Sequence, residues 1–105
     1  MVSSPTQGEV WWAEAEDQRR PVLVCTRSEA IPILTAIVVA PVSRTVRGIP
    51  TEVMLGRDEG LEIECAASFD NLQTIHRGAL TSRLGTLNSV RRSELCEALR
   101  AMSDC

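Results

Sequence analysis

Long apolar runs are missing from this sequence. The longest, residues 36–42, has the length of a strand and is far shorter than a membrane-spanning helix. The N-terminal residues also lack a basic region followed by an apolar one, so they do not have the pattern of a secretion signal. We therefore expect no membrane partner and a cytoplasmic location.

The common signatures of catalytic and metal sites are also absent. There is no GxSxG motif, no glycine-rich phosphate loop and no HExxH motif, and the single histidine, His76, leaves little scope for a histidine dyad. Four cysteines are scattered singly, without the spacing of zinc sites. Cys25 and Cys65 sit in apolar runs, where a small buried side chain is expected. We expect neither a metal nor a cofactor.

Two further absences concern recognition. Tyrosine is missing and phenylalanine occurs once, which argues against an adaptor with an aromatic peptide groove. Lysine is missing too, so all eleven basic residues are arginine, against 14 acidic ones. Nucleic-acid binders are usually basic, but arginine grips phosphate through a two-pronged fork. The positions of the arginines therefore matter more than the net charge of -3.

A chain of 105 residues has the size of one domain, and most of its pattern is that of short strands. Runs of β-branched and apolar residues alternate with turn-forming and charged segments. Pro21 is expected to begin the second strand, where its missing N–H does least harm. Residues 1–7 are expected to form a flexible arm. The expected strands are residues 8–14, 21–27, 33–42, 51–55, 61–67 and 71–76.

The C-terminal segment has a different period. Apolar residues recur at helical spacing from Leu95 to Met102, and Asn88 or Ser89 is available as an N-cap. Several short strands without βαβ alternation, followed by one helix, predict a mainly β fold. We expect one domain over residues 1–105, a small partly closed β barrel with a C-terminal α-helix.

Five sequence words occur in an informative order. They are GEVWWAE at 8–14, RRPVLV at 19–24, VAPVS at 39–43, DNLQTIH at 70–76 and SRLGTL at 82–87. In order and spacing they resemble the MazF/PemK toxin family, from about residue 8 to about residue 102. The resemblance implies an SH3-like barrel of the MazF/Kid/CcdB kind.

The same resemblance implies a function. It is that of the toxin of a type II toxin-antitoxin system, an endoribonuclease that needs neither metal nor ribosome. Such an enzyme cleaves single-stranded RNA by attack of a ribose 2′-hydroxyl on the adjacent phosphate. The implied partners are a second copy of the chain and a MazE-like antitoxin with an acidic, disordered tail.

Three catalytic candidates follow from the family words. Arg20 stands directly before the proline of RPVLV, Ser43 follows the proline of APVS, and Asp70 occupies a position where some relatives have a base. Arginine would clamp the phosphate, and a hydroxyl would donate to its oxygens. Each has a plainer interpretation: Arg20 pairs with Glu16 or Asp17, Ser43 bonds its own backbone, and Asp70 makes a turn.

Further residues are expected to bind RNA. Four lie in the same two loops as Arg20 and Ser43, and two follow Asp70; they are Arg19, Arg44, Thr45, Arg47, Asn71 and Gln73. We expect the arginines to gather around one cleft in an otherwise acidic chain. Trp11 and Trp12 should face opposite sides of their strand. The alternative function is a noncatalytic toxin or binding module of the same fold, such as a gyrase poison or an adaptor.

Overall fold

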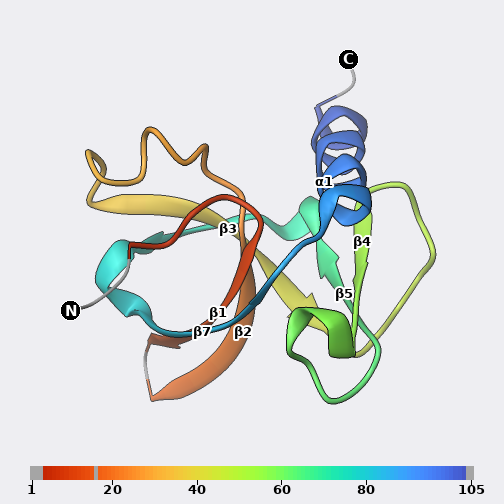
Figure 1. The fold of residues 1–105 in the computed structure, drawn as a ribbon, viewed down its shortest axis with the longest axis horizontal. Coiled ribbons are helices and arrows are strands. Elements are labelled where there is room, and N and C mark those ends of the chain that lie inside the picture. The colour runs from red at the N-terminus through yellow and green to blue at the C-terminus, as the bar shows by residue number, and fades with distance from the viewer. Residues whose placement is uncertain (1–3, 16, 104–105) are drawn as a thin grey trace.

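Seven β-strands and one α-helix are found in residues 4–15 and 17–103, which are the part of the chain described by this computed structural model (Figure 1). The strands are β1 (Glu9–Ala15), β2 (Gln18–Val24), β3 (Ala36–Ser43), β4 (Glu52–Leu55), β5 (Cys65–Ser68), β6 (Gln73–His76) and β7 (Leu80–Thr86). Three short 3-10 helices are η1 (Arg57–Glu59), η2 (Phe69–Asn71) and η3 (Arg77–Ala79), and the α-helix is α1 (Ser89–Met102). None of the described helices is both long and apolar enough to cross a membrane.

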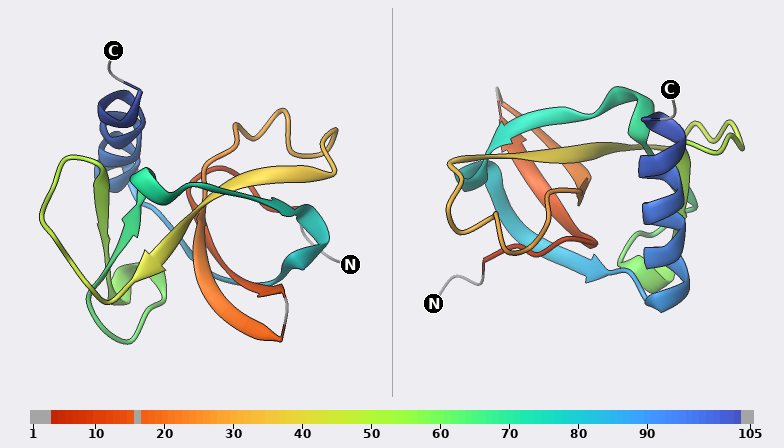
Figure 2. Two further views of the ribbon diagram at one scale, coloured as in Figure 1. Left: turned by 180° about the vertical axis from the view of Figure 1, so that it is seen from behind. Right: turned by 90° about the horizontal axis from the view of Figure 1, so that it is seen from above.

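The sheet is antiparallel and curls into a partly closed barrel. Its strand order is β4-β5-β3-β2-β1-β7, and β6 also pairs with β3. On the edge away from β2, β3 therefore pairs with two strands. It pairs with β6 along its first half and with β5 at Val42 and Ser43. The helix η3 links β6 to β7, which lies next to β1 at the other end of the strand order (Figures 1 and 2). The mainly β fold with a C-terminal helix is confirmed.

The sheet separates two hydrophobic cores, and successive residues of a strand belong to different ones. Val22 and Val24 pack on one side of β2, and Leu23 packs on the other. The barrel-side core consists of Trp11, Val22, Val24, Ile31, Ile37, Val39 and Leu80. The helix-side core consists of Val10, Leu23, Cys25, Ala40, Val53, Leu55, Leu61, Cys65, Ala67, Phe69, Leu87, Leu95 and Ala98. Residues 22–24 of β2 are therefore buried on both faces, as predicted.

Helix α1 closes the helix-side core against β4 (Figure 2). Leu95 and Ala98 are buried there, one turn apart, as their spacing predicts. The N-cap is Asn88, whose Oδ1 accepts the backbone N–H of Arg91 at 2.9 Å. The alternative cap, Ser89, is the first residue of the helix.

Strand β2 begins earlier than predicted. It starts at Gln18, which pairs with Ala15 of β1 across a tight turn that includes Asp17 at a φ of 63°. Pro21 is therefore the fourth residue of the strand and pairs with Trp12, and the prediction that it opens the strand is wrong. The polar and charged residues 18–20 pair with β1 through their backbone, and their side-chain types do not indicate a strand.

Two other predicted strands differ from the structure, and one strand was not predicted. Strand β3 begins at Ala36, so that Ile33 lies in a loop with 82% of its surface exposed. Residues 61–64, predicted as strand from their alternation, form a loop before β5. Strand β7 was not predicted because only Leu80 of its seven residues is buried, so its sequence carries little alternation.

The N-terminal residues 5–7 are anchored to the barrel. Pro5 is buried, and the side-chain amide of Gln7 donates to the carbonyl of Cys25 at 2.9 Å. The backbone N–H of Gln7 donates to Ser28 Oγ at 3.0 Å. The prediction of a flexible arm fails for these three residues, and residues 1–3 lie outside the described part. Cys25 and Cys65 are buried as expected, and burial raises the pKa of Cys25 to about 12.

Glu9 is a buried carboxylate that fastens β1 to its neighbours. Its Oε1 accepts from the backbone N–H of Thr6 at 2.7 Å and from Trp11 Nε1 at 3.1 Å, and its Oε2 pairs with Arg83 of β7 at 3.0 Å. Burial by itself would raise the pKa of Glu9. The hydrogen bonds from Trp11, Arg83 and Thr6 outweigh that effect and hold the pKa below its ordinary value of 4.5.

Candidate active face and arginine groove

Arg20 and Ser43 lie on the same face of the sheet. Arg20 is two residues before Val22 on β2, so both point to the barrel side. Ser43 has the same parity on β3 as Val39, which is also in the barrel-side core. The ladder between the two strands pairs Val22 with Pro41. Arg20 and Ser43 each lie two residues beyond that pair, which is the last of the ladder.

Both side chains are exposed at the open end of this face. Ser43 Oγ accepts the backbone N–H of Thr45 at 3.0 Å, as the plainer interpretation predicted, and its own hydrogen is left to donate to a ligand. The side chain of Arg20 has no hydrogen-bond or ion-pair partner among the described residues, Asp17 included. Glu16, the other proposed partner, lies outside those residues. The guanidinium is therefore open to an anion.

Asp70 lies in η2, at the corner that leads into β6. Its Oδ2 accepts from the hydroxyl of Thr51 at 2.5 Å, and the backbone N–H of Phe69 donates to the carbonyl of Thr51 at 2.9 Å. The carboxylate thus ties this corner to the start of β4. Its other oxygen has no hydrogen-bond partner among the described residues.

Gln73 shares the face of Arg20 and Ser43. It pairs with Val39 across the β3–β6 ladder, so its side chain points to the barrel side, where it is exposed. Asn71 is more constrained, since its Nδ2 donates to Ser68 Oγ at 3.0 Å. We name the exposed set Arg20, Ser43 and Gln73 the active face.

A groove of about 610 Å³ opens on the opposite side of β2. It lies where β2 and β3 separate, because their ladder ends at Val22 and Pro41, and Pro21 and Val42 are the next residues on its walls. We call it the arginine groove. Its lining residues are Trp12, Arg19, Pro21, Val42, Arg44, Gly60, Leu61, Glu62, Ile63, Cys65 and Leu84.

Trp12 and Arg19 form a stacked pair at the groove. The Arg19 guanidinium carbon lies 4.4 Å from the centre of the Trp12 ring, within the range of a cation-π contact. Trp12 is half-buried, whereas Trp11 is 3% exposed, so the prediction that they face opposite sides is confirmed. The stack fixes the arginine beside an apolar wall without neutralising its charge.

The arginines divide between the two faces. Arg19 and Arg44 line the groove, whereas Arg20 points to the active face because it is the next residue along an extended strand. Arg47 and Thr45 are exposed on the loop after β3 and line neither. The expectation that four arginines share one cleft is therefore wrong. It rested on placing Arg19 and Arg20 in a loop, where strand alternation does not apply.

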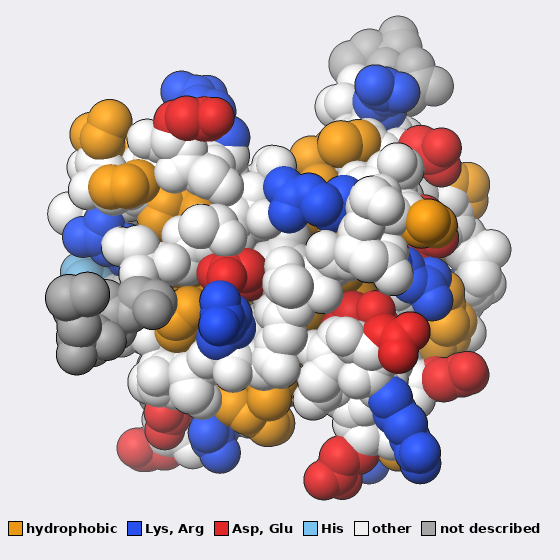
Figure 3. All heavy atoms as spheres, in the orientation of Figure 1, with side chains coloured by type: hydrophobic (Ala, Val, Ile, Leu, Met, Phe, Trp, Pro, Cys, Tyr) orange, Lys and Arg blue, Asp and Glu red, His pale blue; other side chains and the backbone are white. Residues whose placement is uncertain are grey.

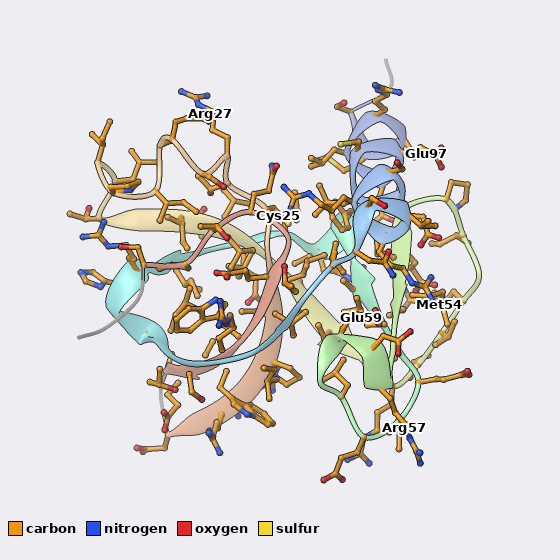
Figure 4. The ribbon with its side chains drawn as sticks, in the orientation of Figure 1. Cys25, Arg27, Met54, Arg57, Glu59 and Glu97 are labelled. Atoms are coloured by element: carbon orange, nitrogen blue, oxygen red, sulfur yellow. The ribbon has the colours of Figure 1, made fainter. Side chains whose placement is uncertain are left out.

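One wall of the groove was missed in the sequence. It is formed by residues 61–63, which follow η1, and by Leu84 of the unpredicted strand β7. In Figure 4 Arg57 of η1 points away from the molecule, while Glu59 lies on its inner side. The wall follows the turn-forming residues GRDEG at 56–60, of which Gly60 adopts a φ of 88° that suits glycine best.

The wall is braced directly against β7. A Cβ on Gly60 would lie 2.2 Å from the carbonyl oxygen of Leu84, and a Cβ on Gly85 would lie 2.4 Å from that of Glu59. Only glycine allows two backbones to approach so closely. Inside the segment, Glu59 is buried and its Oε1 accepts the N–H of Gly56 at 2.7 Å.

Charge on the rest of the surface is mixed. Figure 3 shows acidic and basic side chains interspersed over one face, without a broad patch of either sign. Within residues 4–15 and 17–103, no three His, Cys, Asp or Glu side chains are grouped so that they could hold a metal ion. His76 is a surface residue whose Nδ1 accepts the N–H of Gly78 at 2.9 Å.

Comparison with known proteins identifies the family. The profile of the PemK-like, MazF-like toxin of type II toxin-antitoxin systems matches residues 6–103. The chain belongs to this toxin family.

Similar MazF proteins extend over almost the whole chain. It is 41% identical to the probable endoribonuclease MazF5 of Mycobacterium tuberculosis, with 100% of this chain and 98% of the relative covered. The solved structure of the Mycobacterium tuberculosis toxin MazF-mt6 superposes with a TM-score of 0.84 at 38% identity, over 91% of this chain and 96% of the other.

A more distant structure has the same fold. It is an endoribonuclease in complex with its cognate antitoxin from a mycobacterial species, with a TM-score of 0.81 at 22% identity and 93% of both chains covered. Its agreement supports the barrel and helix described above.

Proposed function

We propose that this chain is an endoribonuclease, the toxin of a type II toxin-antitoxin system, which cleaves single-stranded RNA at specific sequences without metal or ribosome. The observation that carries the proposal is the shared, exposed face of Arg20 and Ser43. Family membership and the names of the MazF relatives support the reaction class.

In the proposed reaction a ribose 2′-oxygen bonds to the neighbouring phosphorus as the bond to the 5′-oxygen breaks. The products are a 2′,3′-cyclic phosphate and a 5′-hydroxyl, so the proton lost by one oxygen balances the proton gained by the other. Arg20 stabilises the charge on the phosphate oxygens, and the Ser43 hydroxyl donates to one of them. Asp70 is the candidate base, through the oxygen that Thr51 does not engage.

The RNA on either side of the cut would extend from the active face toward the arginine groove. Arg19 and Arg44 would hold backbone phosphates there, and the apolar wall beside Trp12 suits a base. Thr45, Arg47, Asn71 and Gln73 remain candidates for further contacts. This path explains how an acidic chain can bind RNA, since only local potential is needed.

A mixed RNA substrate incubated in EDTA tests this function. The wild-type protein is expected to fragment the RNA, and a folded Arg20→Ala protein is expected to leave it intact. Sequencing of the 5′ ends would give the cleavage motif. Intact RNA with the wild-type protein would instead favour the noncatalytic alternative, a toxin or binding module of the same fold.

We further propose that the protein acts in the cytoplasm as a homodimer, controlled by a MazE-like antitoxin with an acidic, disordered tail. The adjacent apolar residues Ile33 and Leu34, 82% and 41% exposed in the loop before β3, support an association surface. Light scattering at micromolar concentration should give about twice the chain mass. A monomer under those conditions would contradict the dimer.

A further inference from the structure

The loop of residues 44–51 between β3 and β4 carries Arg44 to the arginine groove. Its residues 44–50 are all exposed, and its apolar members Val46 and Ile49 are 41% and 37% exposed. Packing against a core therefore does not hold this loop. Hydrogen bonds at its two ends must supply the order.

The far end of the loop is held by one carboxylate. Glu52 Oε1 accepts the backbone N–H groups of Arg47 and Gly48, at 2.9 Å each. The backbone N–H of Glu52 in turn donates to the carbonyl of Ile49 at 3.0 Å. Two successive N–H groups converging on one anionic oxygen form a compact anion-binding turn, and Gly48 adopts a φ of 70° to complete it.

From these contacts we propose that Glu52 is a positioning residue for RNA binding, an inference that rests on the proposed function. Its carboxylate fixes the turn at Arg47 and Gly48, which keeps Arg44 at the groove before RNA arrives. Preorganisation of this kind lowers the ordering cost of binding. The role is geometric, because the negative charge of Glu52 by itself would repel the RNA backbone.

Three substitutions separate geometry from charge. Glu52→Gln keeps an oxygen at the Oε1 position and removes the charge, Glu52→Asp keeps the charge but shortens the reach, and Glu52→Ala removes both. Steady-state cleavage of one RNA oligonucleotide should show KM raised about fivefold in the Asp and Ala variants, the scale of a lost hydrogen bond or two, with kcat unchanged. The Gln variant should keep a KM at or below that of the wild type.

Amide hydrogen exchange supplies a readout of the turn itself. Exchange at Arg47 and Gly48 should speed up in Glu52→Ala and Glu52→Asp and stay slow in Glu52→Gln. Glu64→Ala is the matched control, because it removes an exposed carboxylate that lies outside the arginine groove. It should leave both KM and the exchange of these amides as in the wild type.

Two outcomes would overturn the positioning role. One is a KM that follows charge, so that Gln and Ala agree and Asp resembles the wild type. The other is wild-type KM in both Asp and Ala. If Glu52→Ala does not fold, the contrast between Asp and Gln decides the question. Failure of the proposed function is distinct, since the wild-type protein would then not cut the oligonucleotide at all.

Discussion

At the scale of single residues, Arg20 is exposed and without a partner among the described side chains, so its removal should not disturb the fold. We expect Arg20→Ala to reduce the rate of RNA cleavage by a factor of about 100 or more. Losses of this order follow when a contact to the charge of the transition state is removed. Cleavage rates and circular dichroism on the same preparation check both halves of this prediction. Near-normal turnover by a folded variant would remove Arg20 from the active face.

Ser43→Ala should have a smaller effect than Arg20→Ala, because it removes a neutral donor and the loop contact to Thr45. It should still reduce the rate more than Arg100→Ala, which changes an exposed arginine on α1. An unchanged rate would mean that the hydroxyl serves only the backbone of its loop.

Glu9 gives a prediction about pH. Its pKa is lowered in the folded protein, so its contribution to stability is present above pH 4.5 and is lost as pH falls through the folded value. Glu9→Gln should reduce the free energy of unfolding near neutrality by about 1–3 kcal/mol, as for a lost charged hydrogen bond. It should also flatten the decline of stability below that pH.

Urea denaturation at several pH values measures both effects. Arg83→Met provides a companion, since removal of the cation should raise the pKa of Glu9 and move the acid-induced loss to higher pH. Parallel pH profiles for the wild type and Glu9→Gln would contradict this account of the buried carboxylate.

At the scale of elements, the bracing of η1 against β7 predicts that alanine destabilises the protein at one glycine and not at another. Gly85→Ala forces a Cβ into the carbonyl of Glu59 and should cost about 1–3 kcal/mol of stability, as overpacking does. Gly56→Ala is the control, because a Cβ there meets nothing within 4 Å and its φ of -163° suits any residue. Thermal unfolding of the two variants checks this, and equal melting temperatures would refute it.

Elements with a strong local signal could be predicted from the sequence, and others could not. Strands β1 and β3 and helix α1 have clear periodicity, and the Asn88 cap was among the two candidates. Strand β7 has almost no apolar alternation, and residues 61–64 alternate although they form a loop. In both cases the deciding contacts come from distant parts of the chain, which local pattern does not contain.

The same limit applies to the site. The family words selected Arg20 and Ser43 as candidates, and strand alternation in the structure places both on one face of the sheet. They did not separate Arg19 from Arg20, since the separation depends on the strand beginning at Gln18. The groove wall was missed for the same reasons: residues 61–63 alternate but form a loop, and β7 has almost no apolar alternation.

At the scale of the whole molecule, the proposed RNA and antitoxin ligands are both anionic and should depend on the same loop. The double variant Arg44→Glu with Arg47→Glu should weaken RNA and the acidic antitoxin peptide together, and raised salt should slow the association of each. Binding titrations with both ligands test this. A tight antitoxin complex in a variant that has lost RNA binding would place the inhibitor on a separate surface.

The contact between Gly60 and β7 also bears on how the protein folds. Residues 80–86 brace the groove wall at residues 59–60 and also pair with β1 at residues 9–13. A nascent chain without them has neither a finished barrel nor a finished groove, because these pairings span most of the sequence. The barrel and the groove are therefore completed by the same strand, so a chain in which β7 has not yet closed onto β1 should be unable to bind RNA in the groove.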